Sequence, residues 1–246
     1  DSRTIQPKQW FAAIKGPNFD GHEFIKDAIK NGAAGLIVSS YQDKFKKLPQ
    51  IVTKDTTLTL GKIAKAWREN FDIPIIGITG STGKTSTKEM LFSILKQRFN
   101  VLSTVGNYNN EYGLPLSIMR LKPEHEIAII EMGINAPKEM KYLTDIAQPT
   151  IGIITNIQPA HIGQFSSLEQ ILEEKTKIFE SEKINIAIIN QKDELLKAYA
   201  ENLEAIHTIK YSSDPTSKEH VDISSSETGW VHSVGGLLMQ FKLHTP

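Results

Sequence analysis

The residues with the clearest chemical signature lie in one short segment, residues 79–86, which reads Thr-Gly-Ser-Thr-Gly-Lys-Thr-Ser. The segment directly follows an apolar run and opens a helical pattern, which is the context of a phosphate-binding loop. Backbone N–H groups of a glycine-rich turn and the positive end of a helix dipole both attract phosphate oxygens. We therefore predict an ATP-binding loop that comprises Gly80, Ser81, Thr82, Gly83, Lys84, Thr85 and Ser86.

Two side chains of this loop have specific expected partners. Lys84 is expected to reach the β- and γ-phosphates, and the hydroxyl of Thr85 to bind Mg²⁺. The spacing departs from the usual G-x-x-x-x-G-K-[ST] pattern, because Ile78 stands where the first glycine would fall. The alternative is a glycine-rich turn with a surface lysine. The coincidence of strand, loop, Gly-Lys-Thr and helix favours the phosphate loop.

Polar residues also follow two other predicted strands. Glu131 ends the apolar run at 127–131, and Asn156 and His161 come after the run at 151–155. Because the carboxyl ends of parallel strands share one edge of a sheet, all three would face the phosphate loop, where Mg²⁺ needs oxygen ligands. The residues alone leave two questions open: whether Glu131 is a ligand or a carboxylate in water, and whether His161 is functional or an ordinary loop histidine.

Two further polar stretches favour plain structural roles on the residues alone. Lys175 lies in the run Glu-Glu-Lys-Thr-Lys at 173–177, which is typical of a solvated helix face with local ion pairs. The segment 106–115 contains Asn107 and Asn110 among glycines and a proline. Its amides would suit a polar substrate, but asparagines that form loop-capping Asx turns are the favoured interpretation.

The elements that would position these residues alternate between strand and helix. The first part has strand patterns at 10–14 and 36–38 and helix patterns at 22–30 and 59–70. From Pro74 on, apolar runs at 75–79, 127–131, 151–155, 186–189 and 206–211 alternate with helical patterns at 84–97, 137–146, 168–181 and 192–202. We predict an α/β fold: a small N-terminal α/β domain (1–72), then a P-loop-type doubly wound, mostly parallel sheet with helices on both faces (73–246). Residues 230–243 predict an antiparallel hairpin that turns at Gly235-Gly236.

Composition excludes several classes of protein. The 246 residues contain no cysteine, so disulfides, thiolate metal sites and cysteine nucleophiles are excluded. Lys and Arg number 28, as do Asp and Glu, which argues against a nucleic-acid partner. Mean hydropathy is −0.26, and neither a membrane-length apolar run nor a signal peptide is visible, so a cytoplasmic protein is expected. Asp1 and Pro246 make both ends look cut, as in part of a longer protein.

Taken together, these segments resemble the Mur ligases, ATP-dependent amide-bond ligases of peptidoglycan precursor synthesis, cell-wall biogenesis and cell division. The resemblance covers residues 1 to about 180. It is carried by segments 1–3, 11–16, 20–22, 79–86, 107–115, 131–133, 155–156 and 160–161. Within the family the chain is most similar to the type that adds D-Ala-D-Ala to UDP-MurNAc-tripeptide, because of the Asn-Asn-Glu-Tyr-Gly-Leu-Pro and Glu-Met-Gly runs. The N-terminal unit disfavours a folylpolyglutamate synthase.

The resemblance implies specific roles. Thr85 and Glu131 would hold one Mg²⁺, His161 would help hold a second, and Lys175 would be the lysine that these ligases carbamylate. That modification needs a neutral amine, and therefore a pKa well below about 10.4. The implied catalytic residues are Lys84, Asn156, His161 and Lys175; the implied substrate-binding residues are Ser2, Arg3, Asp20, Gly21, His22, Asn107 and Asn110.

Three positions depart from the family pattern. Gly163 and Ser166 replace a Glu and a Gly, and Lys177 stands where Glu is expected, which would add positive charge near Lys175. Family members also carry a C-terminal domain that closes over ATP, and the chain stops before it. The resemblance therefore implies a UDP-sugar-binding domain (1–72) and an ATP-binding domain (73–246) without that third domain, expected to be a monomer and nearly inactive alone.

The reaction implied is ATP-dependent ligation of D-Ala-D-Ala to UDP-MurNAc-tripeptide through an acyl phosphate. Alternatives that the sequence leaves open are the diaminopimelate or lysine adder of the same family, a UDP-sugar or nucleotide-binding module without ligase activity, and a generic P-loop NTPase.

Overall fold

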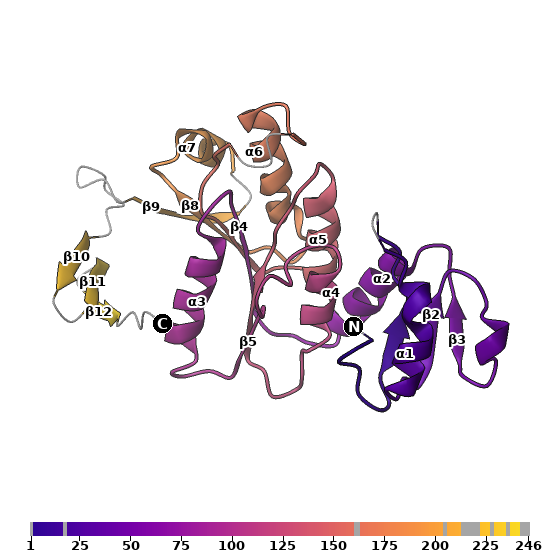
Figure 1. Ribbon diagram of the computed structural model, residues 1–246. Coiled ribbons are helices and arrows are strands. Elements are labelled where there is room, and N and C mark those ends of the chain that lie inside the picture. The colour runs from indigo at the N-terminus through magenta and orange to yellow at the C-terminus, as the bar shows by residue number, and fades with distance from the viewer. Residues whose placement is uncertain are drawn as a thin grey trace.

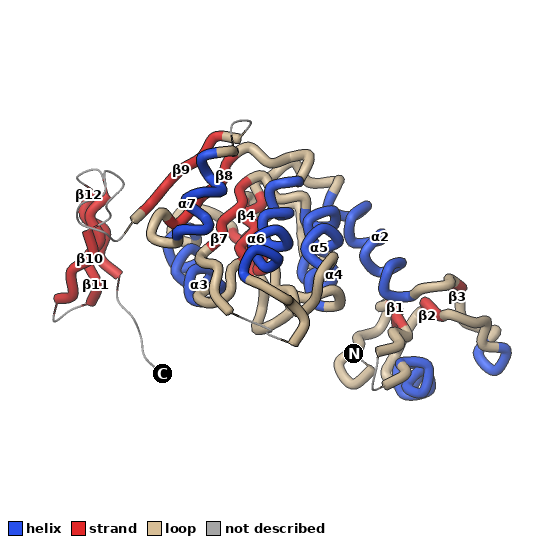
Figure 2. The backbone as a smooth tube through the Cα atoms, turned by 90° about the horizontal axis from the view of Figure 1, so that it is seen from above, coloured by secondary structure: helices blue, strands red, loops and turns tan. Residues whose placement is uncertain are grey.

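The structure is a computed structural model that describes residues 2–16, 19–159, 163–203, 206–212, 222–226, 229–234 and 237–241. Its strands form three separate sheets, with the largest between the other two (Figures 1 and 2). None of the helices in these ranges is long and apolar enough to cross a membrane.

The first sheet has three parallel strands in the order β1 (Trp10–Ala12), β2 (Gly35–Val38) and β3 (Gln50–Val52). A 3-10 turn (Gly21–Phe24) leads into α1 (Ile25–Lys30), whose buried Ile25 and Ala28 pack in a small core with Phe11, Leu36 and Val38. The predicted strand–helix–strand unit is confirmed here. Strand β3 is missing from the prediction, because it has three residues and leaves Ile51 and Val52 exposed.

Helix α2 (Thr56–Arg68) connects this unit to the rest of the molecule. Asp55 caps its first turn, since the carboxylate accepts from the N–H of Leu58. At the same end, the Thr56 hydroxyl donates to the carbonyl of Ala13 in the first unit. At the other end the buried Arg68 guanidinium donates to the carbonyls of Ala147 and Gln148, at the C-terminus of α5 (Glu139–Ala147). The helix therefore makes hydrogen bonds to both parts of the chain.

The central sheet has six parallel strands in the order β5-β6-β4-β7-β8-β9. Their bounds are β4 (Ile75–Thr79), β5 (Val101–Ser103), β6 (Ile127–Glu131), β7 (Ile151–Ile154), β8 (Ile186–Asn190) and β9 (His207–Tyr211). The helices are α3 (Lys84–Leu95), α4 (Gly113–Ile118), α5 (Glu139–Ala147), α6 (Leu168–Thr176), a 3-10 turn (Lys177–Glu180) and α7 (Glu194–Glu201). Strand β4 lies between β6 and β7, so the strand order reverses there, which is the point where open α/β sheets bind ligands.

Helices cover both faces of this sheet, as predicted, but unequally. On one face Leu91, Phe92 and Leu95 of α3 pack against alternate strand residues that include Ile76 and Ile78. On the opposite face the remaining helices enclose the main core, to which β4 contributes Ile75. Figure 2 shows α3 apart from the group formed by α2, α4, α5 and α6. Adjacent residues of one strand face opposite sides, which explains the continuous apolar runs in the sequence.

The last sheet is antiparallel, in the order β10 (Asp222–Ser226), β11 (Gly229–Val234) and β12 (Leu237–Phe241). The predicted hairpin corresponds to β11 and β12, and the glycine pair 235–236 lies outside the described residues. Strand β10 was not predicted, because its Asp-Ile-Ser-Ser-Ser sequence lacks the apolar alternation of a recognisable strand.

Candidate functional site

The loop between β4 and α3 has a backbone that requires its two glycines. Gly80 has a φ of +145°, and a Cβ there would lie 1.9 Å from the Oγ1 of Thr155. Gly83 has a φ of +79° and is the residue immediately before α3. Since L-residues rarely adopt positive φ, both positions explain the glycines of the motif in conformational terms. Gly77, the extra glycine of the imperfect pattern, lies inside β4 instead.

The segment after β7 holds this loop in place. The backbone carbonyl of Asn156 accepts from the N–H of Ser81 (3.0 Å), and its Oδ1 accepts from the N–H of Thr82 (3.0 Å). Its Nδ2 donates to the hydroxyl of Thr82 (2.9 Å), and the hydroxyl of Thr155 donates to the Thr82 carbonyl (2.6 Å). Asn156, one of the implied catalytic residues, therefore holds the loop in place through these hydrogen bonds. The N–H groups of Ser81 and Thr82 already have acceptors within the protein. The backbone N–H groups predicted to bind phosphate must therefore come from the residues that follow Thr82.

Those next residues form the first turn of α3. The first intrahelical bond of the turn runs from the N–H of Thr87 to the carbonyl of Gly83. The N–H groups of Lys84, Thr85 and Ser86 precede it, and such first-turn donors have no partner within a helix. Together with the helix dipole they offer an anion site.

The side chain of Lys84 folds back over the loop. Its Nζ donates to the carbonyls of Gly80 (2.8 Å) and Ser81 (3.3 Å). Burial lowers the pKa of the Lys84 ammonium, and the nearby Glu131 carboxylate opposes that shift. The surface-lysine alternative is therefore wrong, because this ammonium is half-buried within the loop.

Lys175 of α6 reaches the same point. Its Nζ donates to the Gly80 carbonyl at 3.1 Å, and the residue is only 3% exposed. Interpreting the 173–177 run as a solvated face is wrong for this residue: it points inward, toward the loop. Burial, and secondarily the charge of Lys84, lower the pKa of Lys175 to about 7. A neutral amine is thus readily available at this position.

Glu131, at the end of β6, is buried at 2% exposure. The hydroxyl of Thr85 donates to its Oε2 (3.0 Å) and lies 3.2 Å from its Oε1. The register of the sheet explains the meeting, since Glu131 pairs with Ile78 on β4, just before the loop. The structure thus excludes a carboxylate in water and places Glu131 beside the predicted Thr85 ligand.

Two residues of this cluster were missed by sequence reasoning. Asn109 donates from Nδ2 to Oε1 of Glu131 (2.8 Å), although its neighbours Asn107 and Asn110 were the ones singled out. Lys88 of α3 is fully buried, with its Nζ 3.8 Å from Oε2 of Glu131 and 2.9 Å from the carbonyl of Thr104. Its signal was the helical spacing from Thr85, which places a lysine on the same face one turn later.

The two predicted substrate asparagines occupy other positions. Oδ1 of Asn110 accepts from the N–H groups of Tyr112 (3.3 Å) and Gly113 (3.0 Å), so it forms the Asx-type cap of α4 that the residues alone favoured. Asn107 is exposed in the preceding loop.

The departures from the family pattern can be placed in part. Lys177, expected to add positive charge near Lys175, forms an ion pair with the buried Glu174 (2.6 Å), and this carboxylate neutralises the added charge. Gly163 is exposed, and Ser166 donates to the side chain of Gln170. His161 lies outside the described residues, so its predicted catalytic and metal-binding roles stay predictions.

A second polar cluster lies in the N-terminal unit. Nδ1 of His22 is 2.6 Å from Oδ1 of Asp20, and its Nε2 accepts from the backbone N–H of Ser39 (3.0 Å). Since Nε2 accepts, Nδ1 carries the proton and donates to Asp20. The hydrogen bond from the backbone N–H of His22, and secondarily the one from its ring, lower the pKa of Asp20. Gly21 sits against the backbone of Ile14, where a Cβ would approach within 2.6 Å.

The first residues of the chain are less informative. Ser2 is buried, and its carbonyl accepts from the side chain of Asn31 (2.8 Å), whereas Arg3 is exposed. Their predicted contact with a UDP-sugar stays a prediction.

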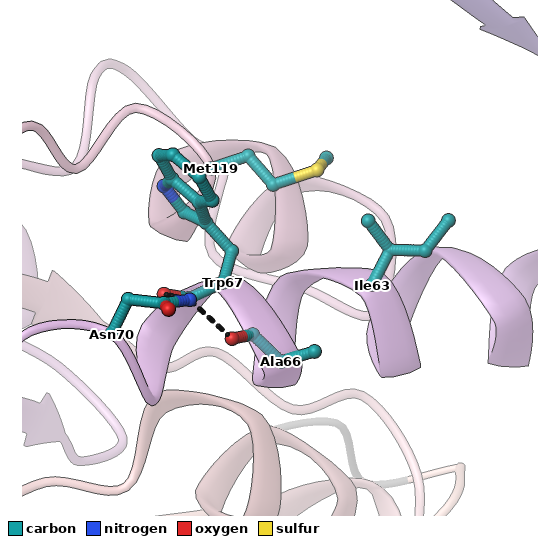
Figure 3. Close-up of a pocket in the computed structure, with 5 residues that line it drawn as sticks. All are labelled: Ile63, Ala66, Trp67, Asn70 and Met119. Carbon is teal, nitrogen blue, oxygen red and sulfur yellow. Dashed lines mark hydrogen bonds between the residues drawn. The ribbon is translucent and has the colours of Figure 1, made fainter.

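A shallow groove of about 540 Å³ lies elsewhere, between α2 and the end of α4. It is lined by Ile63, Ala66, Trp67, Asn70 and Met119 (Figure 3). This lining includes none of the predicted site residues.

Magnesium fits the donors beside the loop. Glu131 and Thr85 offer oxygen atoms, which Mg²⁺ prefers, and phosphate and water oxygens would complete its shell. Among the described residues no group of three or more His, Asp or Glu side chains could hold a metal ion by itself. The site therefore suits a metal shared with a phosphate ligand.

The parallel sheet, the phosphate-type loop at its switch point and the carboxylate beside it define the class of P-loop-type α/β proteins. Family comparison is more specific. Residues 78–246 match the Mur ligase middle domain, and residues 1–68 match the catalytic domain of the Mur ligase family. The chain belongs to the Mur ligase family.

Individual relatives point to one branch of that family. The UDP-N-acetylmuramoyl-tripeptide--D-alanyl-D-alanine ligase of Buchnera aphidicola subsp. Baizongia pistaciae is 39% identical over 248 residues, which cover 100% of this chain and 52% of the relative. A MurF crystal structure from Acinetobacter baumannii has a TM-score of 0.84 at 32% identity, over 94% of this chain and 51% of that one. MurF from Thermotoga maritima, in complex with ADP, has a TM-score of 0.84 at 31% identity, over 98% and 56%. The chain spans about half the length of the curated relatives it matches.

Proposed function

We propose that this chain provides the N-terminal (1–72) and central (73–246) domains of a cytoplasmic ligase that joins D-Ala-D-Ala to UDP-MurNAc-tripeptide at the expense of ATP. The observation that carries the proposal is the convergence of Lys84, Lys175 and Glu131 on one phosphate-type loop. The names of the relatives support the choice of substrates.

The proposed reaction has two steps. A carboxylate oxygen of the tripeptide attacks the γ-phosphorus of ATP, the bond from that phosphorus to the bridging oxygen breaks, and ADP leaves. The amine of D-Ala-D-Ala then attacks the acyl carbon, inorganic phosphate leaves with the C–O electron pair, and the amine loses a proton.

The residues of the loop have distinct tasks in the first step. Two anions must approach each other, so positive charge fixed at the phosphates supplies most of the acceleration. Lys84 would leave its carbonyl acceptors for the β- and γ-phosphates, and the first-turn N–H groups of α3 would bind the same phosphates. Thr85 and Glu131 would hold Mg²⁺, which when bound neutralises phosphate charge.

Lys175 would act as the anion-forming lysine. Its pKa of about 7 gives a neutral amine at physiological pH, which is the form that reacts with CO₂. The carbamate formed would be an anion within reach of Lys84 and the loop, and so able to bind or orient a metal.

The N-terminal unit would hold the nucleotide-sugar end of the substrate. The Asp20–His22 turn is a rigid polar surface with a defined histidine tautomer, and Ser2, Arg3, Asn107 and Asn110 are the further proposed contacts. We propose a monomer, with ATP and Mg²⁺ required for activity.

Phosphate release by the full-length enzyme tests the proposal. We expect release to require both UDP-MurNAc-tripeptide and D-Ala-D-Ala. Equal release without either substrate would indicate a generic NTPase. Release that requires UDP-MurNAc-dipeptide together with diaminopimelate or lysine would indicate the diaminopimelate or lysine adder of the same family. Calorimetry with UDP-MurNAc-tripeptide alone distinguishes a binding module, which would bind it without any turnover.

A further inference from the structure

Lys88 is a buried charge for which the proposed reaction has no use. Its side chain is 1% exposed, in the middle of α3, where a lysine normally extends into water. Its Nζ donates to the carbonyl of Thr104 (2.9 Å) and lies 2.9 Å from the exposed carboxylate of Glu89 and 3.8 Å from Oε2 of Glu131. Burying an ammonium carries a desolvation cost even when the charge is paired, so the burial of this lysine requires an explanation.

The surroundings of Glu131 provide one. Its carboxylate receives hydrogen bonds from Thr85 and Asn109 and faces the Lys88 ammonium. The backbone N–H of Glu131 donates to the hydroxyl of Thr104, whose carbonyl is the acceptor for Lys88. Glu131 and Lys88 are thus fixed relative to each other by one residue at the end of β5.

Three lysines lie around the loop and Glu131. Lys84 and, when protonated, Lys175 converge on Gly80, and Lys88 contacts both the exposed carboxylate of Glu89 and the buried carboxylate of Glu131. Such a site attracts a polyanion and repels a bare divalent cation, because the ammonium of Lys88 lies within a few ångströms of the ligand that the cation would use.

We infer that Lys88 is the counter-ion of Glu131 that prevents Mg²⁺ from binding before the nucleotide. Lys88 would be a positioning residue that acts through Glu131 and not by contact with phosphate or metal. The negative charge of a bound triphosphate would outweigh the ammonium of Lys88, so that Thr85 and Glu131 could then hold the metal. The inference rests on the proposed function in that Glu131 is taken as the ligand of the nucleotide's metal.

Titration of the nucleotide-free, full-length protein with Mn²⁺, followed by electron paramagnetic resonance of the free ion, tests this. We expect Lys88→Met to bind Mn²⁺ at least tenfold more tightly than the parent protein, and Lys88→Arg, which keeps the charge, to match the parent. Glu89→Gln is the matched control, since it removes the exposed partner of Lys88 and should leave the affinity unchanged. Adding Glu131→Gln to Lys88→Met should abolish the gain.

Mn²⁺ affinity that stays equal or falls in Lys88→Met would overturn the inference. Lys88→Gln covers the case in which the methionine variant does not fold, because its amide can still donate toward the Thr104 carbonyl while the charge is lost. It should show the same tighter binding. Failure of the proposed function would appear separately, as phosphate release that is independent of substrate, which the Mn²⁺ titration does not measure.

Discussion

Lys84 and Lys175, from the two separate helices α3 and α6, donate to the same carbonyl oxygen, that of Gly80. Two ammonium groups on one acceptor repel each other, and this proximity contributes to the lowered pKa of Lys175. We propose that Lys84 binds phosphate as an ammonium. Lys175, with its pKa of about 7, loses its proton more easily.

The first prediction concerns that division of roles. Lys84→Ala in the full-length enzyme should lower kcat by on the order of 10²–10³, because one preorganised charge contact to the phosphates is lost. Phosphate release under saturating substrates measures the effect. Lys122→Ala, at an exposed lysine, is the matched control and should retain parental turnover. Near-parental kcat for Lys84→Ala would contradict the assignment.

A second prediction follows from the pKa of Lys175. Its folded-state value of about 7 lies below the ordinary value of 10.5, so the unfolded chain binds more protons between these values. Folding stability should therefore rise with pH from about 7 to 10.5, as the penalty for a buried ammonium is relieved. Lys175→Met removes that penalty. We expect the variant to have the higher Tm at pH 6–7, and the difference to shrink steadily toward pH 10.

Lys177→Met provides the control of opposite sign. The ion pair with Glu174 raises the pKa of Lys177, so its loss should lower the Tm at neutral pH. A Tm difference between parent and Lys175→Met that does not change with pH would contradict a pKa lowered by burial.

A third prediction tests the loop backbone. Gly80→Ala should destabilise the fold by about 1–3 kcal/mol or more, because the φ is unfavourable and the new Cβ meets Thr155. Chemical denaturation measures the loss. Gly163→Ala, with nothing near its Cβ, should be nearly neutral. Thr155→Ala alone removes the hydroxyl that donates to the Thr82 carbonyl, so its cost is measured in both backgrounds. It should cost less stability in Gly80→Ala than in the parent, because it also relieves the clash, and an equal cost in both would argue against the steric cause.

A fourth prediction concerns the joint between α2 and α5. Arg68→Met should lower the free energy of unfolding by about 1–3 kcal/mol or more, because the carbonyls of Phe71, Ala147 and Gln148 lose their donor in a buried place. Urea denaturation measures the change. Nucleotide affinity should stay at the parental value at temperatures where the variant is folded, since Arg68 contacts no part of the loop. A large fall in affinity with unchanged stability would be the contrary result.

The sequence predicted the long central strands and the main helices because they combine a clear hydrophobic periodicity with glycine or proline residues at their ends. Ile75–Thr79 is a continuous β-branched run, and Gly80 marks its end. Strands β3 and β5 were missed, since three residues carry too little pattern. Helix α4 was missed because it contains Pro115 and opens within a glycine-rich stretch that favours a loop.

The residues of the site also differ in whether local sequence is enough to predict them. Lys84 and Thr85 follow from local spacing, whereas the contacts of Lys175, Lys88 and Asn109 depend on which elements lie side by side. A lysine among glutamates looks solvated until α6 is placed over the loop, and no local signal distinguishes Asn109 from its two asparagine neighbours. Such identities come from tertiary geometry, which single-sequence patterns do not encode.

The hydrogen bonds from Thr155 and Asn156 to the loop bear on the thermodynamics of nucleotide capture. Ordering a free backbone residue costs about 1–2 kcal/mol of conformational entropy. Here Ser81 and Thr82 are already immobilised by the strand beside them, so the ligand is spared that cost and more of its contact energy is available as affinity. Without the Asn156 amide, the entropy of ordering Ser81 and Thr82 would be lost when the nucleotide binds. Calorimetry would then show a more unfavourable binding entropy, although the phosphate contacts stay the same.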